Sequence, residues 1–239
     1  MRYTDPSGHD VGCGGMDASS CSTYGVIAID IVQDYIYEKH VGLVQSVTRG
    51  QTSDLEALAQ LIEYASSFSP YDGYRFIQNV GASVTGHNRG SAAISEVLIQ
   101  SGIGNLEYDR RYINVLETGQ LLQTGYAITF QDPGAGGNQA HHFWFYVQVG
   151  YESGLLLGEI GNIFHETFLA KNRVGMSKED LALGSEGVRL GYYLRQRSIQ
   201  PISTGNYIRE TLKPGSNASQ YWEKQWKPID RPPLIISPN

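Results

Sequence analysis

The sequence predicts a mainly α-helical fold, an irregular helical bundle with long loops that leaves room for a few short strands. Helix-capping signals at Ser53 and Ser177 each precede residues with helical spacing. Residues 138–194 hold three segments in which small, apolar or histidine side chains recur every three or four residues, as on one face of a helix. A chain of 239 residues is long enough to bury the core of one large domain.

The N-terminal half contains one strong helix signal. Ser53-x-x-Glu56 has the form of a capping box and is followed by a stripe of leucine and isoleucine that ends before Pro70. Residues 24–40 fit a strand by their β-branched content and a helix by their apolar spacing, and we favour a helix. Residues 70–90 are expected to form loops and short extended pieces.

The remaining segments are assigned more coarsely. A further helix is expected over residues 91–100, apolar patches between residues 108 and 130, and a glycine-rich loop over 131–137. Residues 204–212 fit a last helix, and the Trp- and Pro-rich tail is expected to lie over the domain surface.

The chain divides into a flexible leader, residues 1–23, and a single helical domain, residues 24–239. The leader is rich in Gly and Ser and holds Cys13 and Cys21, the only cysteines. A disulfide between them and two free thiols are equally compatible with this segment.

Charge and hydropathy count against two broad functions, general nucleic-acid binding and membrane spanning. The formal net charge is −6 and no run of Lys or Arg exceeds two residues, which disfavours a general nucleic-acid binder. No apolar run approaches the ~20 residues that span a bilayer. The sequence thus carries no strong nucleic-acid or membrane signal.

One helical face between residues 180 and 191 is nearly free of side chains. It is formed at i, i+4, i+7 and i+11 by Asp180, Gly184, Gly187 and Gly191. Each interior glycine costs a helix roughly 0.5–1 kcal/mol relative to alanine, so we expect another backbone to approach this face. A matching stripe is formed by Gly158, Gly161, His165 and Phe168. Packing of the two stripes would bring His165 beside Asp180.

A third helical face supplies His142 together with Phe145, Tyr146 and Val149, whereas His141 points elsewhere. We therefore expect His142, His165 and Asp180 to hold a divalent metal, zinc or a similar ion. A metal-bound water would attack an ester, amide or phosphodiester. Glu166 would be the general base where it is not itself a ligand. The catalytic candidates are thus Glu166, His165, Asp180 and His142.

Other interpretations of the same residues stay open. Asp180 can serve only the capping box that Ser177 begins, and His141 and His142 can be buried core histidines. The zinc-protease pattern His-Glu-x-x-His is absent because position 169 is Leu. Alternative functions are a metal-free glycan hydrolase that uses Glu166 as its acid, ADP-ribosyl transfer, and a helical module that binds a partner or enters a membrane.

The segment Arg2-Tyr-Thr-Asp-Pro-Ser-Gly-His9 resembles the motif that ends the core of RHS-repeat (YD-repeat) proteins. The resemblance implies a β-repeat shell upstream, a C-terminal toxin effector domain that is secreted or delivered into a target cell, and a cognate immunity protein as partner. It also implies that Asp5 belongs to a self-cleaving protease site with the cut near His9. Residues 138–191 resemble a loose group of helical domains at the ends of such proteins, from which no activity can be transferred.

Overall fold

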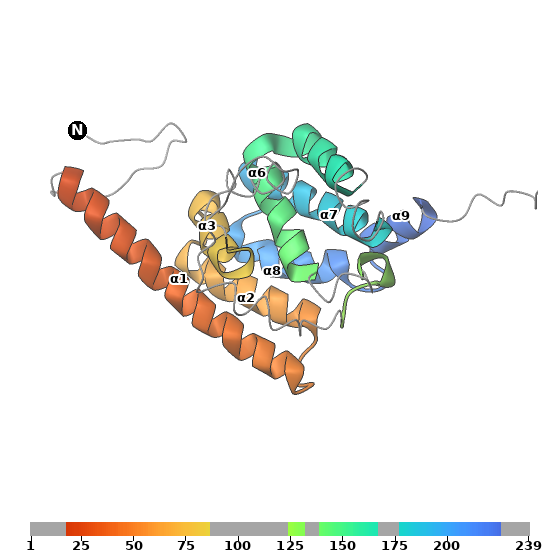
Figure 1. Cartoon of the computed structure of the whole chain (residues 1–239), viewed down its shortest axis with the longest axis horizontal. Helices are drawn as coiled ribbons and strands as arrows, with labels where there is room; N and C mark the ends of the chain where they lie inside the picture. Colours follow the sequence, from red (N-terminus) through yellow and green to blue (C-terminus); the bar gives the residue numbers. More distant parts are fainter. Residues whose placement is uncertain (1–17, 87–123, 132–138, 167–176, 226–239) are drawn as a thin grey trace, which may run out of the picture.

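The computed structural model describes residues 18–86, 124–131, 139–166 and 177–225 (Figure 1). These residues form helices and no strand, so the predicted mainly α fold is confirmed. None of the described helices is long and apolar enough to cross a membrane. The helix expected over residues 91–100, the loop over 131–137 apart from its first residue, and the position of Phe168 lie outside the described residues. In chain order the elements are α1 (Ala18–Thr48), α2 (Asp54–Phe68), α3 (Gly73–Val84), η1 (Ile128–Phe130), α6 (Gln139–Phe164), α7 (Lys178–Arg195), α8 (Pro201–Leu212) and α9 (Asn217–Gln225).

The long helix α1 runs along one side of the molecule and contacts α2 and α3 (Figure 1). It confirms the helix favoured over residues 24–40. Because α1 begins at Ala18, the leader boundary expected at residue 23 lies inside a helix, which also contains Cys21. His40 ties α1 to α3, since its Nδ1–H donates to the Ser83 carbonyl oxygen at 3.0 Å. Burial lowers the pKa of His40 to about 4.

Ser53 caps the start of α2 as expected, because the Glu56 N–H donates to Ser53 Oγ at 3.2 Å, whereas the Glu56 carboxylate pairs with Gln60 and Arg209. The leucine stripe behind it is buried, and α2 ends at Phe68 as expected. Its outer edge pairs with α8, where Arg209 forms ion pairs with Glu56 and Glu63. This pairing adds a charged edge to an interface whose interior is apolar.

The loop prediction for residues 70–90 is wrong over α3. The Arg75 N–H donates to the Asp72 side chain at 3.1 Å, which caps the helix. Phe76 lies edge-on against Trp144 of α6, with ring centroids 5.6 Å apart. Burial of Phe76, Ile77, Val80 and Val84 on one face outweighs the low helix propensity of the glycines and polar residues in this segment.

The C-terminal helices close the core on the side opposite α1. The helix expected over 204–212 is confirmed as α8, which begins three residues earlier at Pro201. The described part of the predicted tail is helix α9, and residues 226–239 lie outside the described residues. At the start of α9, the Ser219 N–H donates to Ser216 Oγ at 3.0 Å. Trp222 of the same helix is 9% exposed.

Candidate metal centre

Three helical segments build the site, as the spacing predicts. Helix α6 consists of two parts joined at Gly154, whose φ of 79° and ψ of 178° interrupt the helix. Such a backbone conformation favours glycine. The first part runs from Gln139 to the kink, and the second continues to His165 and Glu166 in a π-helical turn. Helix α7 is the third segment, and it packs along both parts of α6.

The glycine face of α7 receives another backbone, and the expected close approach is confirmed. A Cβ atom at Gly187 would lie 2.5 Å from the Phe143 carbonyl oxygen, and one at Gly191 would lie 2.1 Å from the Val147 carbonyl oxygen. Any larger residue would force the two helices apart. The backbone that contacts these glycines belongs to the first part of α6, whereas the sequence spacing predicted contact with the segment that holds Gly158 and His165.

The expected pairing of two glycine faces is therefore wrong in detail. In the second part of α6, Gly158 meets the side chain of Val188, and no atom of another described segment lies within 4 Å of the Cβ position of Gly161. The residue that fills the space above Gly184 is Asn162, whose Oδ1 lies 2.3 Å from the Cβ position of that glycine. A polar side chain, and not a bare backbone, thus fills the face of α7 nearest the site.

One group of side chains can hold a metal ion. His142, Glu166 and Asp180 each offer a ligand atom, and these atoms lie within 4.8 Å of one another. Glu166 is 2% exposed, and the side chain of His142 is 15% exposed. His142 Nε2 lies 3.8 Å from Glu166 Oε1. One imidazole and two carboxylates from three helical segments therefore converge in a largely buried place.

His165, which the sequence analysis placed among the ligands, lies beside this group. Its Nδ1–H donates to Glu166 Oε1 at 2.9 Å. Two of the three predicted ligands, His142 and Asp180, are in the group. Its third member is Glu166, the predicted general base. A histidine that donates to a ligating carboxylate fixes the orientation of that carboxylate, which is a common arrangement around metal sites.

The imidazole of His142 is neutral near physiological pH. Burial lowers its pKa to about 4, although the nearby charge of Glu166 acts in the opposite direction. Its Nε2–H donates to the backbone carbonyl of Asp180 at 2.9 Å. The neutral ring is the form that binds metals, and a cation at Nε2 would take the place of this proton.

Asp180 lies in the first turn of α7 and belongs to the group that can hold a metal. Its N–H donates to Ser177 Oγ at 3.0 Å, which is the predicted cap. Its carboxylate accepts a hydrogen bond from Gln139 Nε2 at 3.3 Å. The Oε1 atom of this buried glutamine has no hydrogen-bond partner among the described residues. Capping and a role in the site are therefore compatible for Asp180.

His141 points away from the group, as predicted. Its Nδ1–H donates to the Val84 carbonyl oxygen of α3 at 3.3 Å, and its ring stacks on Phe145. It thus joins α6 to α3 as a partly buried histidine.

Tyr146 is the site residue that the sequence analysis treated only as part of the apolar face. It is 1% exposed, and its ring centroid lies 5.0 Å from that of His142 and 6.4 Å from that of His165. Its hydroxyl group has no hydrogen-bond partner among the described residues. A sequence pattern could have identified Tyr146 as a site residue. Gln139, His142 and Tyr146 lie at i, i+3 and i+7, on one face of the helix.

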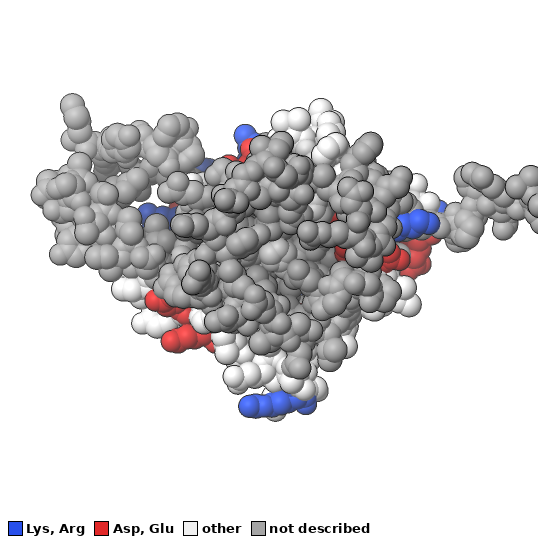
Figure 2. Space-filling model, in the orientation of Figure 1, with Lys and Arg blue, Asp and Glu red and all other residues white. Residues whose placement is uncertain are grey.

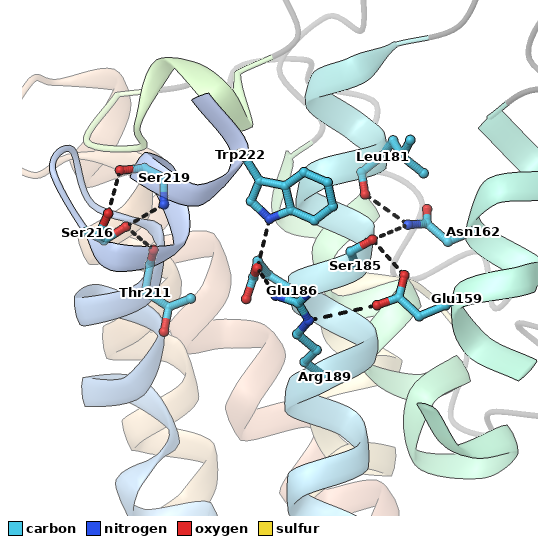
Figure 3. A network of polar contacts seen from close by, with 10 residues as sticks. All are labelled: Glu159, Asn162, Leu181, Ser185, Glu186, Arg189, Thr211, Ser216, Ser219 and Trp222. Carbon is cyan, nitrogen blue, oxygen red and sulfur yellow. Dashed lines mark hydrogen bonds and ion pairs between the residues drawn. The ribbon is translucent and has the colours of Figure 1, made fainter. Parts of the chain in front are cut away.

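Polar contacts hold the second part of α6 against α7 (Figure 3). Asn162 Nδ2 donates to the Leu181 carbonyl oxygen at 2.9 Å and to Ser185 Oγ at 3.1 Å. Ser185 Oγ in turn donates to Glu159 Oε2 at 2.7 Å. Because Asn162 lies one turn before Glu166, these contacts fix the helix that carries a ligand.

The same network extends across α7 to the C-terminal helix (Figure 3). Arg189 Nη1 donates to the buried Glu186 at 2.7 Å, and Trp222 Nε1 donates to the same carboxylate oxygen at 2.8 Å. The guanidinium of Arg189 also lies 5.8 Å from the ring of Trp222. Helix α9 is thereby linked through α7 to the side of the site that holds Glu166.

No protein-family model, curated protein or solved structure matches the chain. A proposal about function therefore depends on the chemistry of His142, Glu166 and Asp180.

Proposed function

We propose that the chain is a divalent-metal-dependent hydrolase whose ion, zinc or a similar one, is held by His142, Glu166 and Asp180. The observation that carries the proposal is the convergence of their ligand atoms within 4.8 Å. Three protein ligands leave a coordination position for water, which is the pattern of catalytic rather than structural zinc sites. A metal lowers the pKa of such a water to about 7, so that it attacks as hydroxide.

The charges of the group support a bound cation. Two carboxylates meet in a largely buried place, and the imidazole between them is held neutral by burial. Buried carboxylates repel each other and lose hydration, so a nearby cation stabilises their charged forms. His165 donates a hydrogen bond to Glu166, and a divalent cation would compensate both carboxylates at once.

The resemblance of Arg2–His9 supplies a biological setting for the proposed hydrolase. In that setting the chain is the effector domain of an RHS-repeat toxin, delivered as part of a larger protein and neutralised by an immunity protein. The substrate class is an ester, an amide or a phosphodiester, since metal-activated water attacks each of these.

Metal binding by matched variants tests the proposal. Zinc is titrated into purified wild type, His142→Ala and His141→Ala by calorimetry, and the metal content is measured by elemental analysis. We expect stoichiometric zinc in wild type and in His141→Ala, and a loss of affinity of at least roughly 100-fold in His142→Ala because one ligand is gone. Equal affinity of the two variants, or no binding by wild type, would contradict the proposed site.

Growth of a bacterial host that expresses each variant tests the hydrolase itself. Toxicity should disappear in His142→Ala and weaken in His165→Ala, because the latter leaves Glu166 without its orienting hydrogen bond. Toxicity that persists in both variants would argue against every function centred on this site.

The same carboxylates support a second candidate, metal-free glycan hydrolysis. Glu166 is 2% exposed and faces Asp180, which is the arrangement of a buried acid beside a second carboxylate. Activity on peptidoglycan that resists a strong chelator would favour this candidate over the metal site.

A further inference from the structure

We propose that Tyr146 is a catalytic residue of this site, and that its hydroxyl group donates a hydrogen bond to the carbonyl or phosphoryl oxygen of the substrate. The inference rests on the proposed function, because the substrate oxygen is placed beside the metal ligands. It adds a residue that touches the reacting group and that is not itself a metal ligand.

The position of Tyr146 is set from both helices. Its Cβ lies only 3.0 Å from the Cβ position of Gly187, so the missing side chain of that glycine allows the close approach. Its ring lies against the rings of His142 and His165. Phe145 covers another edge, with ring centroids 5.1 Å apart. The ring is therefore held on several sides within the site.

The hydroxyl group of Tyr146 lacks a hydrogen-bond acceptor among the described residues. It is buried and has no partner among the described residues, although native interiors leave few buried polar atoms unpaired. The ring that carries it has its centroid 5.0 Å from that of His142, one of the three proposed ligands. An oxygen atom that enters between these ligands is the acceptor that the hydroxyl lacks.

The phenol of Tyr146 can act as a hydrogen-bond donor. The ordinary pKa of a tyrosine hydroxyl is about 10, well above neutral pH. The phenol consequently keeps its proton and cannot act as a base. A fixed donor of this kind stabilises an oxygen atom that gains negative charge during hydrolysis.

The chemistry is balanced without any transfer from Tyr146. The oxygen of water bonds to the carbonyl or phosphoryl centre, and the bond to the leaving group breaks. The leaving group takes up the proton that the water releases. The hydrogen bond from the phenol strengthens as the substrate oxygen becomes more negative, and it weakens again in the product.

A matched pair of variants isolates this hydrogen bond. Tyr126 is also a buried tyrosine whose hydroxyl has no partner among the described residues, but the charge that acts on it belongs to Asp54. We would compare wild type, Tyr146→Phe and Tyr126→Phe. Each variant loses one unpaired buried hydroxyl, so both should keep the fold, as thermal unfolding would verify.

Calorimetry would measure the affinity of each protein for zinc, and then the affinity of the zinc-loaded protein for inorganic phosphate as a probe of the substrate oxygen. We expect all three to bind zinc equally. Phosphate should bind roughly 10- to 100-fold more weakly to Tyr146→Phe, the range for one hydrogen bond to a charged acceptor. Tyr126→Phe should match wild type.

Each outcome decides a different point. Weaker phosphate binding confined to Tyr146→Phe supports the inference. Equal phosphate affinity in all three proteins, no phosphate binding by zinc-loaded wild type, or weaker zinc binding by Tyr146→Phe overturns it and leaves the metal site in place. Absence of zinc binding in wild type overturns the proposed function and the inference together.

Discussion

The two parts of α6 attach to α7 in opposite ways. In the first part, nearly every side chain from Phe143 to Val149 is buried, and the backbone lies directly on the glycine face of α7. In the second part, Glu159 and Asn162 face α7 through hydrogen bonds, while the apolar side chains point outward. The exposed apolar residues are Leu155, Leu156, Leu157, Ile160, Ile163 and Phe164.

This contrast is visible from outside the molecule. The second part of α6 lies at the upper edge of the molecule in Figure 1, and uncharged atoms gather there in Figure 2. The reversal begins at Gly154, whose backbone conformation redirects the helix. The part of α6 before Gly154 therefore buries apolar side chains, and the part after it buries polar ones.

The difference shows how the site divides its tasks. The first part positions His142 and Tyr146 by close packing, which leaves little freedom of movement. The second part brings Glu166 to them through directional polar contacts, which fix a geometry but add less stability per residue. We therefore expect substitutions in the first part to affect the whole fold and substitutions in the second part to affect chiefly the site.

The largest effect is expected where backbone meets backbone. Gly191→Ala places a Cβ atom 2.1 Å from the Val147 carbonyl oxygen and 2.6 Å from the Tyr151 nitrogen. Neither atom can move without separating the helices, so the variant should lose about 3 kcal/mol of unfolding free energy, the upper end of typical overpacking costs. Urea denaturation would measure it.

Gly161→Ala is the matched control for that loss. It lies in the second part of α6, and no atom from elsewhere in the described part of the chain comes within 4 Å of its Cβ position. Alanine there should stabilise the chain by about 0.5–1 kcal/mol, because glycine is a poor helix former. Similar losses in the two variants would mean that the two parts of α6 are packed alike.

These glycines also show what sequence can and cannot establish. A stripe of glycines predicts that some backbone comes close, since nothing else compensates for their low helix propensity. It does not name the partner, and the approach to Gly187 and Gly191 comes from the first part of α6. The serine caps at Ser53 and Ser177, which depend only on local chemistry, are both found where the sequence predicts them.

The sequence could not decide whether His165 or Glu166 joins His142 and Asp180, and the reason is geometric. Two rows of residues on the helix surface begin at Gly158, one continuing at i+3 and the other at i+4. The two rows separate along the helix. The row through Gly161 ends at His165, whereas the row through Asn162 ends at Glu166. Packing of Asn162 over Gly184 selects the second row, and that contact is tertiary. Helix α3 was missed for a similar reason, since its stability comes from burial.

An intermediate effect is expected at Asn162. Asn162→Ala removes the hydrogen bonds to the Leu181 carbonyl and to Ser185, and should cost about 1–3 kcal/mol. Zinc affinity should also fall by roughly 10-fold, the lower range for a residue that supports a ligand, since Glu166 lies one turn away. Calorimetric zinc titration of the folded variant would measure this. Unchanged zinc affinity would show that Glu166 is positioned without this network.

The smallest effect is expected on the outer face. Leu156 is 72% exposed, so Leu156→Gln should change the unfolding free energy by no more than about 0.5 kcal/mol. Val149→Ala in the buried first part provides the contrast and should cost about 1 kcal/mol or more. Chemical denaturation of both variants in dilute solution would compare them. A large loss for Leu156→Gln would mean that the apolar face is covered in solution, and the second part of α6 would then be held from both sides rather than by its polar contacts alone.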